Sequence, residues 1–580
     1  MTIEQDHHRA TGWRAVALEM MEGTREAIIR LPVTALFLLL MTLNASLLIA
    51  DRGLFSIGGE KDFVLPFLAA ALASLAVGLL CESRNAGPWL RHGCGIVAGT
   101  MAFCLIWLHD ATYSLRWTLV VALAGLVVVS PYTARGTGAA LWLFAVRLAF
   151  AIILAALALF LFAGGISAIF ASLTYLFGIE VPNNLYLHVW AVTGLLAAPL
   201  FGLGQIPREF AAEPDATAAG FMERGMRALG DFVAAPLLIV YALILHLYGL
   251  KILVTGEVPQ GQIGWLVLAF GFCVFGSLIV IHPFLSAARA PTRLLLRLWP
   301  FMLPVPLLLL FYALALRVGQ YGVTPERFLL GLFGIVAAIL LTLQILPRTR
   351  GDIRYMTALP VIALALASFG PQGAVATALR SQSVRFLTIV NNPPVEGERH
   401  DEALSALRYL SSENAARRVA PDGFDDRNAG GSEYRAVALA WGLDPDRPRF
   451  DNGEYFTLNY PQSGALEVGD FDLMVPNISV YGGNAQPGAL KLPGGAALGI
   501  RLDENAVVIA KGGSETRFVF SADEIRGLVD KGQTETPTIV LESDGRKILL
   551  VPTFISGRVR SDPQLTGLSG TLLLRARDWR

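Results

Sequence analysis

The stretch Ala139–Gly164 reads AALWLFAVRLAFAIILAALALFLFAG and contains a single charged residue, Arg147. About 20 consecutive apolar residues allow a helix to cross roughly 30 Å of hydrocarbon. Lipid offers the backbone no water to bind, so a lone spanning segment has to be helical. The stretch therefore predicts a transmembrane helix, with Arg147 close enough to its start for the side chain to extend to the membrane surface.

The composition of the whole chain agrees with this prediction. Hydrophobic residues make up 54% of the 580 residues and charged residues 16%, whereas a soluble domain carries about 25% charged residues. The 46 basic and 46 acidic residues balance, which disfavours nucleic acid as a partner. The four cysteines form no Cys/His cluster, so we expect no metal site, disulfide framework or cofactor.

Ten further apolar runs predict that the chain crosses the membrane about eleven times in residues 31–370. The predicted spans are Leu31–Ala50, Phe63–Cys81, Cys94–Leu108, Leu115–Pro131, Ala139–Gly164, Leu185–Leu203, Phe232–Val254, Gly264–Leu285, Leu298–Leu316, Phe328–Leu346 and Arg354–Phe369. The run Gly165–Phe177 is too short to cross alone, and we predict a separate re-entrant or interfacial segment there.

Basic residues in the short connections predict the orientation. Sixteen arginines fall on the side of the N-terminus and six basic residues on the other side. Basic residues of short loops stay in the cytoplasm, so the N-terminus is predicted to be cytoplasmic. Residues 1–30 have the pattern of an amphipathic helix on that membrane surface. An odd number of spans then places the C-terminal domain outside.

The chain changes character after Gly370, where long apolar runs stop. We predict a helical connector over 371–450 and a β-rich extracytoplasmic domain over 451–580, because short strand patterns there alternate with turn residues. The predicted strands are Tyr455–Tyr460, Val507–Ala510, Arg517–Phe520, Thr538–Glu542, Ile548–Val551 and Thr571–Arg575. The predicted fold class is thus an α-helical polytopic membrane domain followed by a soluble, mostly β domain, a sandwich or a partly open barrel.

Four polar motifs set among apolar runs resemble the bacterial membrane family called domain of unknown function 4153. They are Glu180-Val-Pro-Asn-Asn-Leu-Tyr-Leu, Tyr241-Ala-Leu-Ile-Leu-His-Leu-Tyr, Arg317-Val-Gly-Gln-Tyr-Gly-Val-Thr-Pro-Glu-Arg, and Phe369-Gly-Pro followed by Leu379-Arg-Ser-Gln. The resemblance covers roughly residues 140–390. It implies a protein of the bacterial inner membrane, and it brings no reaction, substrate or catalytic residue with it.

Polar residues collect at the predicted outer ends of several spans. They are Glu180, Asn184, His188, His246, Lys251, Glu257, Arg317, Gln320, Tyr321 and Arg380. Polar groups at membrane depth are costly and are often functional, so one hypothesis is an outward-facing polar groove. The alternative is ordinary anchoring, since aromatic and basic residues are common at the membrane surface.

Asp51 and Asp110 lie at the outer ends of early spans and suggest a second hypothesis. An outer carboxylate could act as a base or hold a metal beside a lipid-linked donor, as in membrane-embedded glycosyl- or phosphotransferases. Such residues at helix ends are more often simply solvated. We therefore expect a non-enzymatic protein, permease-like or a scaffold whose outer domain binds an envelope lipid, glycan or protein, with the transferase as the alternative.

Overall fold

The computed structural model of the chain forms two compact units, Met1–Ser381 and Gln382–Arg580. The residues that it describes are 24–50, 64–133, 136–211, 225, 228–256, 263–424, 432–445, 449–451, 455–460, 468–482, 490–491, 497–512, 514–531, 537–558 and 563–579. Most of the predicted amphipathic segment 1–30 lies outside these ranges, and residues 24–30 are helical.

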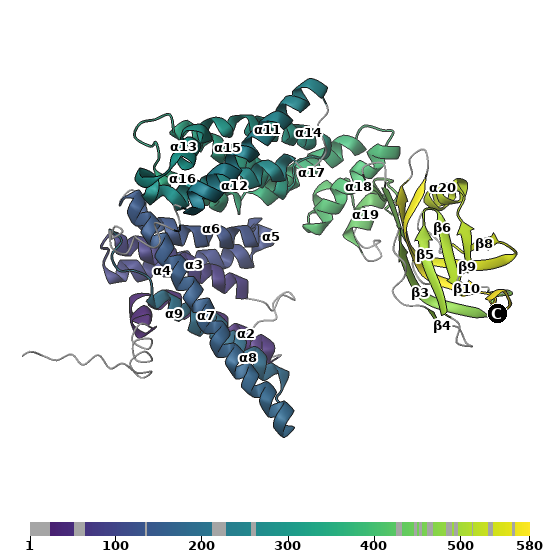
Figure 1. The fold of residues 1–580 in the computed structure, drawn as a ribbon, viewed down its shortest axis with the longest axis horizontal. Coiled ribbons are helices and arrows are strands. Elements are labelled where there is room, and N and C mark those ends of the chain that lie inside the picture. Colours follow the sequence, from purple (N-terminus) through teal and green to yellow (C-terminus); the bar gives the residue numbers. More distant parts are fainter. Residues whose placement is uncertain are drawn as a thin grey trace, which may run out of the picture. The chain divides into compact units, whose positions relative to one another are not determined.

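The first unit is helical throughout its described residues (Figure 1). Its helices are α2 (Pro32–Ile49), α3 (Val64–Ser83), α4 (Pro88–Trp107), α5 (His109–Thr112), α6 (Arg116–Val129), α7 (Gly138–Phe177), α8 (Asn183–Val192), α9 (Ala198–Gly204), α11 (Ala235–Thr255), α12 (Ile263–Ile281), α13 (Ala290–Met302), α14 (Pro304–Tyr321), α15 (Pro325–Leu343), α16 (Ile353–Ala367) and the start of α17 (Ala374–Val390).

Nine helical segments of the described residues are long and apolar enough to cross a membrane, all within residues 32–343. Two shorter apolar helices, Arg116–Tyr132 and Ile353–Ala367, occupy the fourth and the last predicted spans. Each of the eleven predicted spans therefore corresponds to an apolar helical segment. The predicted polytopic helical domain is confirmed.

Proline marks the start of several of these helices. Pro32, Pro88, Pro304 and Pro325 each occupy one of the first two positions of a helix. A proline fits there because the first N–H groups of a helix have no intrahelical partner and its fixed φ suits the helix. The prolines thus account for where these four helices begin.

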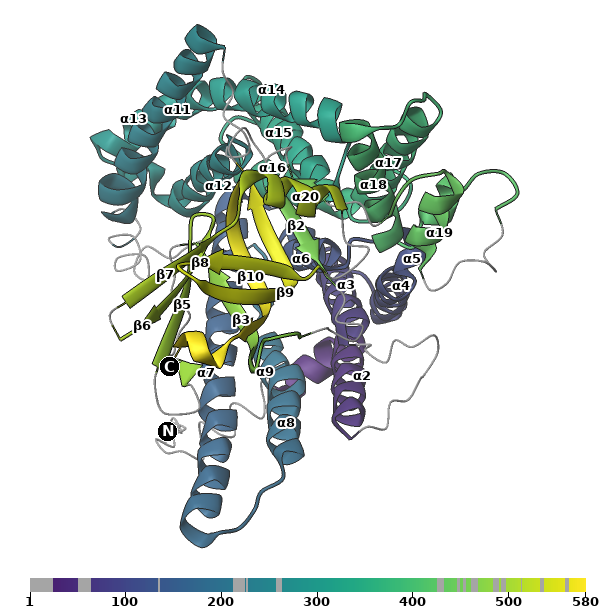
Figure 2. The same cartoon turned by 90° about the vertical axis from the view of Figure 1, so that its right-hand side faces the viewer.

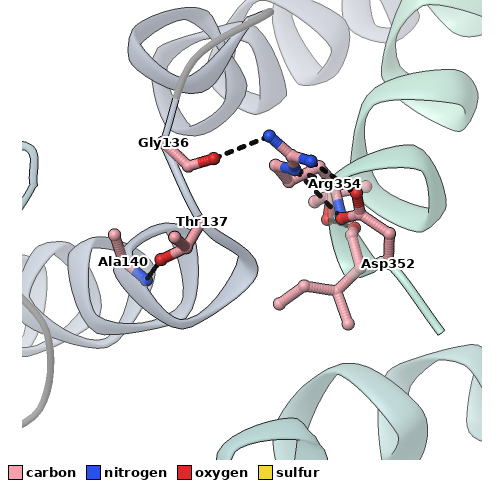
Figure 3. Close-up of polar contacts among 7 residues, drawn as sticks. Gly136, Thr137, Ala140, Asp352 and Arg354 are labelled. Carbon is pink, nitrogen blue, oxygen red and sulfur yellow. Dashed lines mark hydrogen bonds and ion pairs between the residues drawn. The ribbon is translucent and has the colours of Figure 1, made fainter. Parts of the chain in front are cut away.

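Polar contacts fix the start of α7 to the start of α16 (Figure 3). Thr137 Oγ1 accepts a hydrogen bond from Ala140 N at 3.2 Å, and Asp352 Oδ1 accepts one from Arg354 N at 2.9 Å. The Arg354 guanidinium donates to Asp352 Oδ2 and to Gly136 O, both at 2.7 Å. Burial acts to raise the pKa of the Asp352 carboxyl, but the hydrogen bonds and charge of Arg354 outweigh it and hold this pKa below its ordinary value.

Helix α7 is much longer than a span requires. Its 40 residues correspond to about 60 Å at 1.5 Å per residue. Helix α8 runs beside it (Figures 1 and 2), and Trp190 Nε1 donates to Ser167 Oγ at 3.1 Å. The prediction of a separate segment at Gly165–Phe177 is wrong, because α7 continues through it without a break. Gly164 and Gly165 cost the helix only about 1 kcal/mol each. A break in the helix within lipid would leave backbone N–H and C=O groups unpaired.

The predicted span Leu298–Leu316 consists of two helices. Helix α13 ends at Met302 and α14 begins at Pro304. Pro304 has no N–H to donate to the preceding turn, so the ladder of hydrogen bonds stops there. The pair still forms one apolar run from Ala290 to Tyr321.

Glycines allow close approach of the helices around α12. A Cβ on Gly264 of α12 would lie 2.7 Å from Leu330 Cδ2 of α15, and one on Gly125 of α6 would lie 2.6 Å from Val361 Cγ2 of α16. Lipid tails are as apolar as the surface of a spanning helix, so the hydrophobic effect does not drive helices together within the bilayer. Helices there associate largely through close packing, which small residues allow. These contacts place α12 beside α15 and α6 beside α16, and α15 also packs against α16.

The second unit begins with helices, within the range predicted as a connector. They are the end of α17, α18 (Gly397–Ser412) and α19 (Glu433–Ala440). The rings of Phe386 and Trp441 are 6.2 Å apart, and Trp441 Nε1 donates to Val419 O at 2.8 Å. His400 Nε2 accepts a hydrogen bond from Asp444 N at 3.0 Å. The helices thus form a small packed layer ahead of the strands.

Two antiparallel sheets follow. The strands are β1 (Arg449–Asp451), β2 (Tyr455–Asn459), β3 (Leu473–Tyr481), β4 (Leu490–Lys491), β5 (Ala497–Asp503), β6 (Ala506–Lys511), β7 (Ser514–Val519), β8 (Ile539–Ser543), β9 (Arg546–Arg558) and β10 (Gln564–Leu574), with α20 (Ala522–Lys531) between β7 and β8. One sheet has the order β1-β2-β9-β10-β3 with β8 also paired to β9, and the other has the order β4-β5-β6-β7. Figure 2 shows the long strands β9 and β10 in the larger sheet.

The two sheets share one apolar core. Phe456, Ile509, Phe518 and Leu572 are buried together in it. Strand β3 contacts β5, and β7 contacts β8, so the two sheets pack against each other at two places. The predicted mostly β C-terminal region is confirmed.

Candidate functional site

A cavity of about 920 Å³ lies among α6, α12, α14, α15 and α16 of the helical unit. Most of its wall is apolar, with Leu310, Leu330, Phe333 and Met356 among the lining residues. The wall follows α15 from Glu326 to Leu340, which is about 21 Å of helix. The space is thus long, and its charged side chains lie near one end.

The cavity is open on one side. Trp265 and Phe272 of α12 line it, yet they are 75% and 62% exposed. Both belong to an apolar helix of the membrane domain, so the opening faces the surroundings of that helix rather than the interior of the protein.

The polar end is built by the connection between α14 and α15. Arg317, Gln320 and Tyr321 come from the last turns of α14, and Glu326 and Arg327 from the first turn of α15. Both helix ends supply the same end of the cavity because the connection between them is only three residues long.

A glycine makes this short connection possible. Gly322 ends α14 with φ at 72°, in the left-handed region that favours glycine. Thr324 and Pro325 then begin α15. Val323 N donates to Ser381 Oγ at 2.9 Å, which fixes the middle of the turn.

The two arginines at this end differ in their contacts. Arg327 Nη1 donates to Gly322 O at 2.7 Å, and its guanidinium lies 5.5 Å from the centre of the Tyr321 ring. Arg327 therefore closes the C-terminal end of α14. Arg317 is half-buried and, within the described part of the chain, has no side-chain hydrogen bond or ion pair. Its charge is available at the end of the cavity.

Gly276 lies on the apolar wall, at the far end of α12. A Cβ at this position would meet no atom within 4 Å. Gly276 thus borders open space, unlike the glycines of α12 that contact a neighbouring helix.

Three residues predicted for the outer-face groove, Arg317, Gln320 and Tyr321, come together at the polar end of this cavity. Six other predicted groove residues do not line it in the described structure: Glu180, Asn184, His188, His246, Lys251 and Arg380. Glu257 lies outside the described residues. The structure therefore gathers one part of the predicted set, the part carried by α14.

The remaining predicted residues have local surroundings of their own. His246 Nδ1 lies 2.8 Å from Ala242 O one turn back in α11. Arg380 donates to backbone carbonyls, including Ala376 O at 3.3 Å. Glu180 and Lys251 are exposed. None of these contacts joins the residues into a network in the described structure.

The acidic pair of the alternative hypothesis is described in part. Asp51 lies outside the described residues. Asp110 lies in the short helix α5, and its Oδ1 is 2.9 Å from His109 Nε2. Arg116 also contacts His109. Among the described residues, no group of three or more His, Cys, Asp or Glu side chains could hold a metal ion.

Two features of the helical unit were not predicted from the sequence. One is the cavity wall itself. An apolar residue on a span can face lipid, another helix or a cavity, and the hydrophobic pattern of the sequence is the same in all three cases. The other is Asp231, which is 1% exposed and accepts a hydrogen bond from Arg289 N at 3.1 Å. The Asp231 carboxylate thus lies at the N-terminal end of α13, where a negative charge interacts favourably with the helix dipole.

The helical unit matches a family described as "Domain of unknown function (DUF4153)" over residues 35–383. The chain belongs to the DUF4153 family. The match starts well before the stretch of roughly 140–390 that carries the sequence resemblance, and it contains every residue that lines the cavity. The predicted family is confirmed, and this DUF4153 chain is a multi-pass membrane protein.

An uncharacterized protein of Pasteurella multocida (strain Pm70) is 30% identical to this DUF4153 chain over 119 residues. The aligned part is 20% of this chain and 19% of the relative, so the chain covers about a fifth of that relative's length. No solved structure matches the chain.

Proposed function

We propose that this DUF4153 protein is a non-enzymatic protein of the bacterial inner membrane that binds a membrane lipid in the cavity between α6, α12, α14, α15 and α16. It acts as a permease-like protein or a scaffold for that envelope component. The supporting observation is the shape of the cavity, which is about 21 Å long and mostly apolar, with its charged side chains near one end. A lipid has the same division into an apolar chain and a polar head.

The side opening supports lipid entry from the bilayer. Trp265 and Phe272 are exposed where they line the cavity, so an acyl chain can enter between helices without leaving the apolar phase. Burial of one methylene from water is worth about 0.8 kcal/mol, and this gain is small for a lipid that is already in hydrocarbon. Selectivity therefore has to come from the fit of the chain and from the polar end.

The proposed orientation places the polar end of the cavity at the outer leaflet. It follows from the excess of basic residues on the side of the N-terminus, which favours a cytoplasmic N-terminus. The proposed location of the β-rich C-terminal domain is the periplasm, where it binds an envelope component.

Retained lipid tests the proposal. Purified protein transferred from membranes into mild detergent should keep about one lipid per chain, visible as a mass increase in native mass spectrometry. The variant Gly276→Leu fills open space in the cavity, and we expect it to lower the retained lipid about tenfold, the effect of roughly 1.4 kcal/mol.

Gly165→Leu is the matched control. Gly165 is a helical glycine of α7 with nothing within 4 Å of an added Cβ, and it does not line the cavity. This variant should retain lipid as the wild type does. Equal retention in wild type and Gly276→Leu would contradict lipid binding in the cavity.

A further inference from the structure

The polar end of the cavity carries more positive than negative charge. Arg317 and Arg327 contribute two positive charges and Glu326 one negative charge. Arg327 is already held by Gly322 O and the Tyr321 ring. Glu326 is exposed at the first turn of α15, and within the described residues it forms no ion pair with Arg317. The charge left for a ligand is that of Arg317.

A half-buried guanidinium without a partner is costly in a membrane domain. Arg317 lies one turn before the end of α14, so its long side chain can reach the polar surface layer. Guanidinium forms its strongest contacts with phosphate and carboxylate, through two parallel N–H···O hydrogen bonds. A phosphate at this point would meet a donor that the described protein leaves unused.

We propose that the cavity selects a phospholipid with a net negative headgroup, with the lipid phosphate on Arg317 and an acyl chain along α12 and α15. This inference rests on the proposed lipid binding and names the class of lipid. Free phosphate does not use the apolar wall, which continues along α15 from Leu329 to Leu340, about 16 Å beyond the polar end. The phosphate is therefore that of a lipid.

The test uses the whole protein in nanodiscs containing equal amounts of phosphatidylglycerol and phosphatidylethanolamine. After release into detergent, the lipids that stay bound are identified by mass spectrometry. Wild type should be enriched in phosphatidylglycerol about tenfold over the bilayer. Both lipids offer a phosphate, but the ammonium group of phosphatidylethanolamine cancels the charge that Arg317 attracts. Arg317→Gln should bind the same number of lipids in the ratio of the bilayer. Arg317→Lys, which keeps the charge, should recover part of the enrichment.

The control is Lys251→Gln. Lys251 is an exposed basic residue near the end of α11, where the sequence predicts the same outer depth, and it does not line the cavity. The enrichment of phosphatidylglycerol in the Lys251→Gln variant should equal that in wild type. Unchanged enrichment in Arg317→Gln would overturn the inference while leaving lipid binding intact, and a wild type without retained lipid would overturn lipid binding itself. Displacement of the lipid by inorganic phosphate would overturn the assignment of a lipid phosphate.

Discussion

Gly271 of α12 lies directly against the ring of Phe333 of α15, with no room for a Cβ between them. Gly276, little more than one turn further along α12, borders open space. Gly271→Leu should therefore lower the unfolding midpoint, because overpacking costs about 1–3 kcal/mol. Gly276→Leu should leave the midpoint unchanged or raise it, since leucine is the better helix former. Tryptophan fluorescence during heating in detergent measures both, and a larger loss in Gly276→Leu would show that the cavity is not open space.

The Asp352–Arg354 pair predicts a dependence of stability on pH. Asp352→Asn should lower the unfolding midpoint at neutral pH, because the lost pair is worth about 1 kcal/mol at partial exposure. The folded-state pKa of Asp352 is depressed, so its contribution is complete above the unfolded-state pKa of about 3.9 and is lost as the pH falls through the lower folded-state value.

The difference between wild type and Asp352→Asn should thus stay constant from neutral pH to about pH 5 and shrink in stronger acid. Melting curves across this range measure it. Arg354→Gln should remove the same pH-dependent contribution to stability, because it removes the guanidinium that pairs with Asp352. A difference that grows in acid would contradict this role of Asp352.

Residues 382–580 should fold without the helical unit, because they form a compact unit with their own apolar core. The fragment should give a β-dominated circular dichroism spectrum and a cooperative melt. Gly570→Ala should destabilise it by about 1–3 kcal/mol, since the new Cβ would lie 2.8 Å from Pro552 Cα. Gly499→Ala is the control, because its nearest atom is Ala510 Cβ at 3.8 Å. Equal melts for the two variants would argue against the described pairing of β9 and β10.

A reporter fused after Arg580 should be extracytoplasmic. The basis is the excess of basic residues on the N-terminal side together with an odd number of spans. Alkaline phosphatase at this position should be active, and a green fluorescent protein should stay dark. The reverse pattern would mean that one span has been missed or added.

The sequence predicts the elements of this fold better than their packing. Long apolar runs have only one regular conformation in lipid, so the spans were predictable, including the short helices α6 and α16. The length of α7 was not, because the rule of 20 residues assumes that a span ends where the hydrocarbon ends. The hydrophobic pattern does not show whether a helix continues beyond the hydrocarbon layer.

In the second unit, β1, β3, β4, β5 and α20 were not predicted. Pro476 and Asn477 interrupt the apolar alternation of β3, yet β3 is an edge strand, where proline is tolerated. Helix α20 begins with a capping box that the sequence did contain. Ser521 Oγ accepts from Glu524 N at 3.2 Å, and Glu524 Oε2 accepts from Ser521 N at 2.7 Å.

The candidate site was predictable only at its polar end. Arg317, Gln320 and Tyr321 stand out because they follow an apolar run. The residues that meet them across the cavity, such as Trp265 and Met356, come from distant spans, and hydrophobic periodicity does not report which spans are neighbours.

A photoactivatable phosphatidylglycerol with a diazirine in its acyl chain reports which residues the bound acyl chain contacts. After illumination in membranes, labelled peptides are mapped by mass spectrometry. If the lipid occupies the cavity, labels should fall on cavity residues such as Phe275 and Leu310, and they should be lost in Gly276→Leu but not in Gly165→Leu. Labels confined to surfaces outside the cavity, and unchanged by Gly276→Leu, would contradict it.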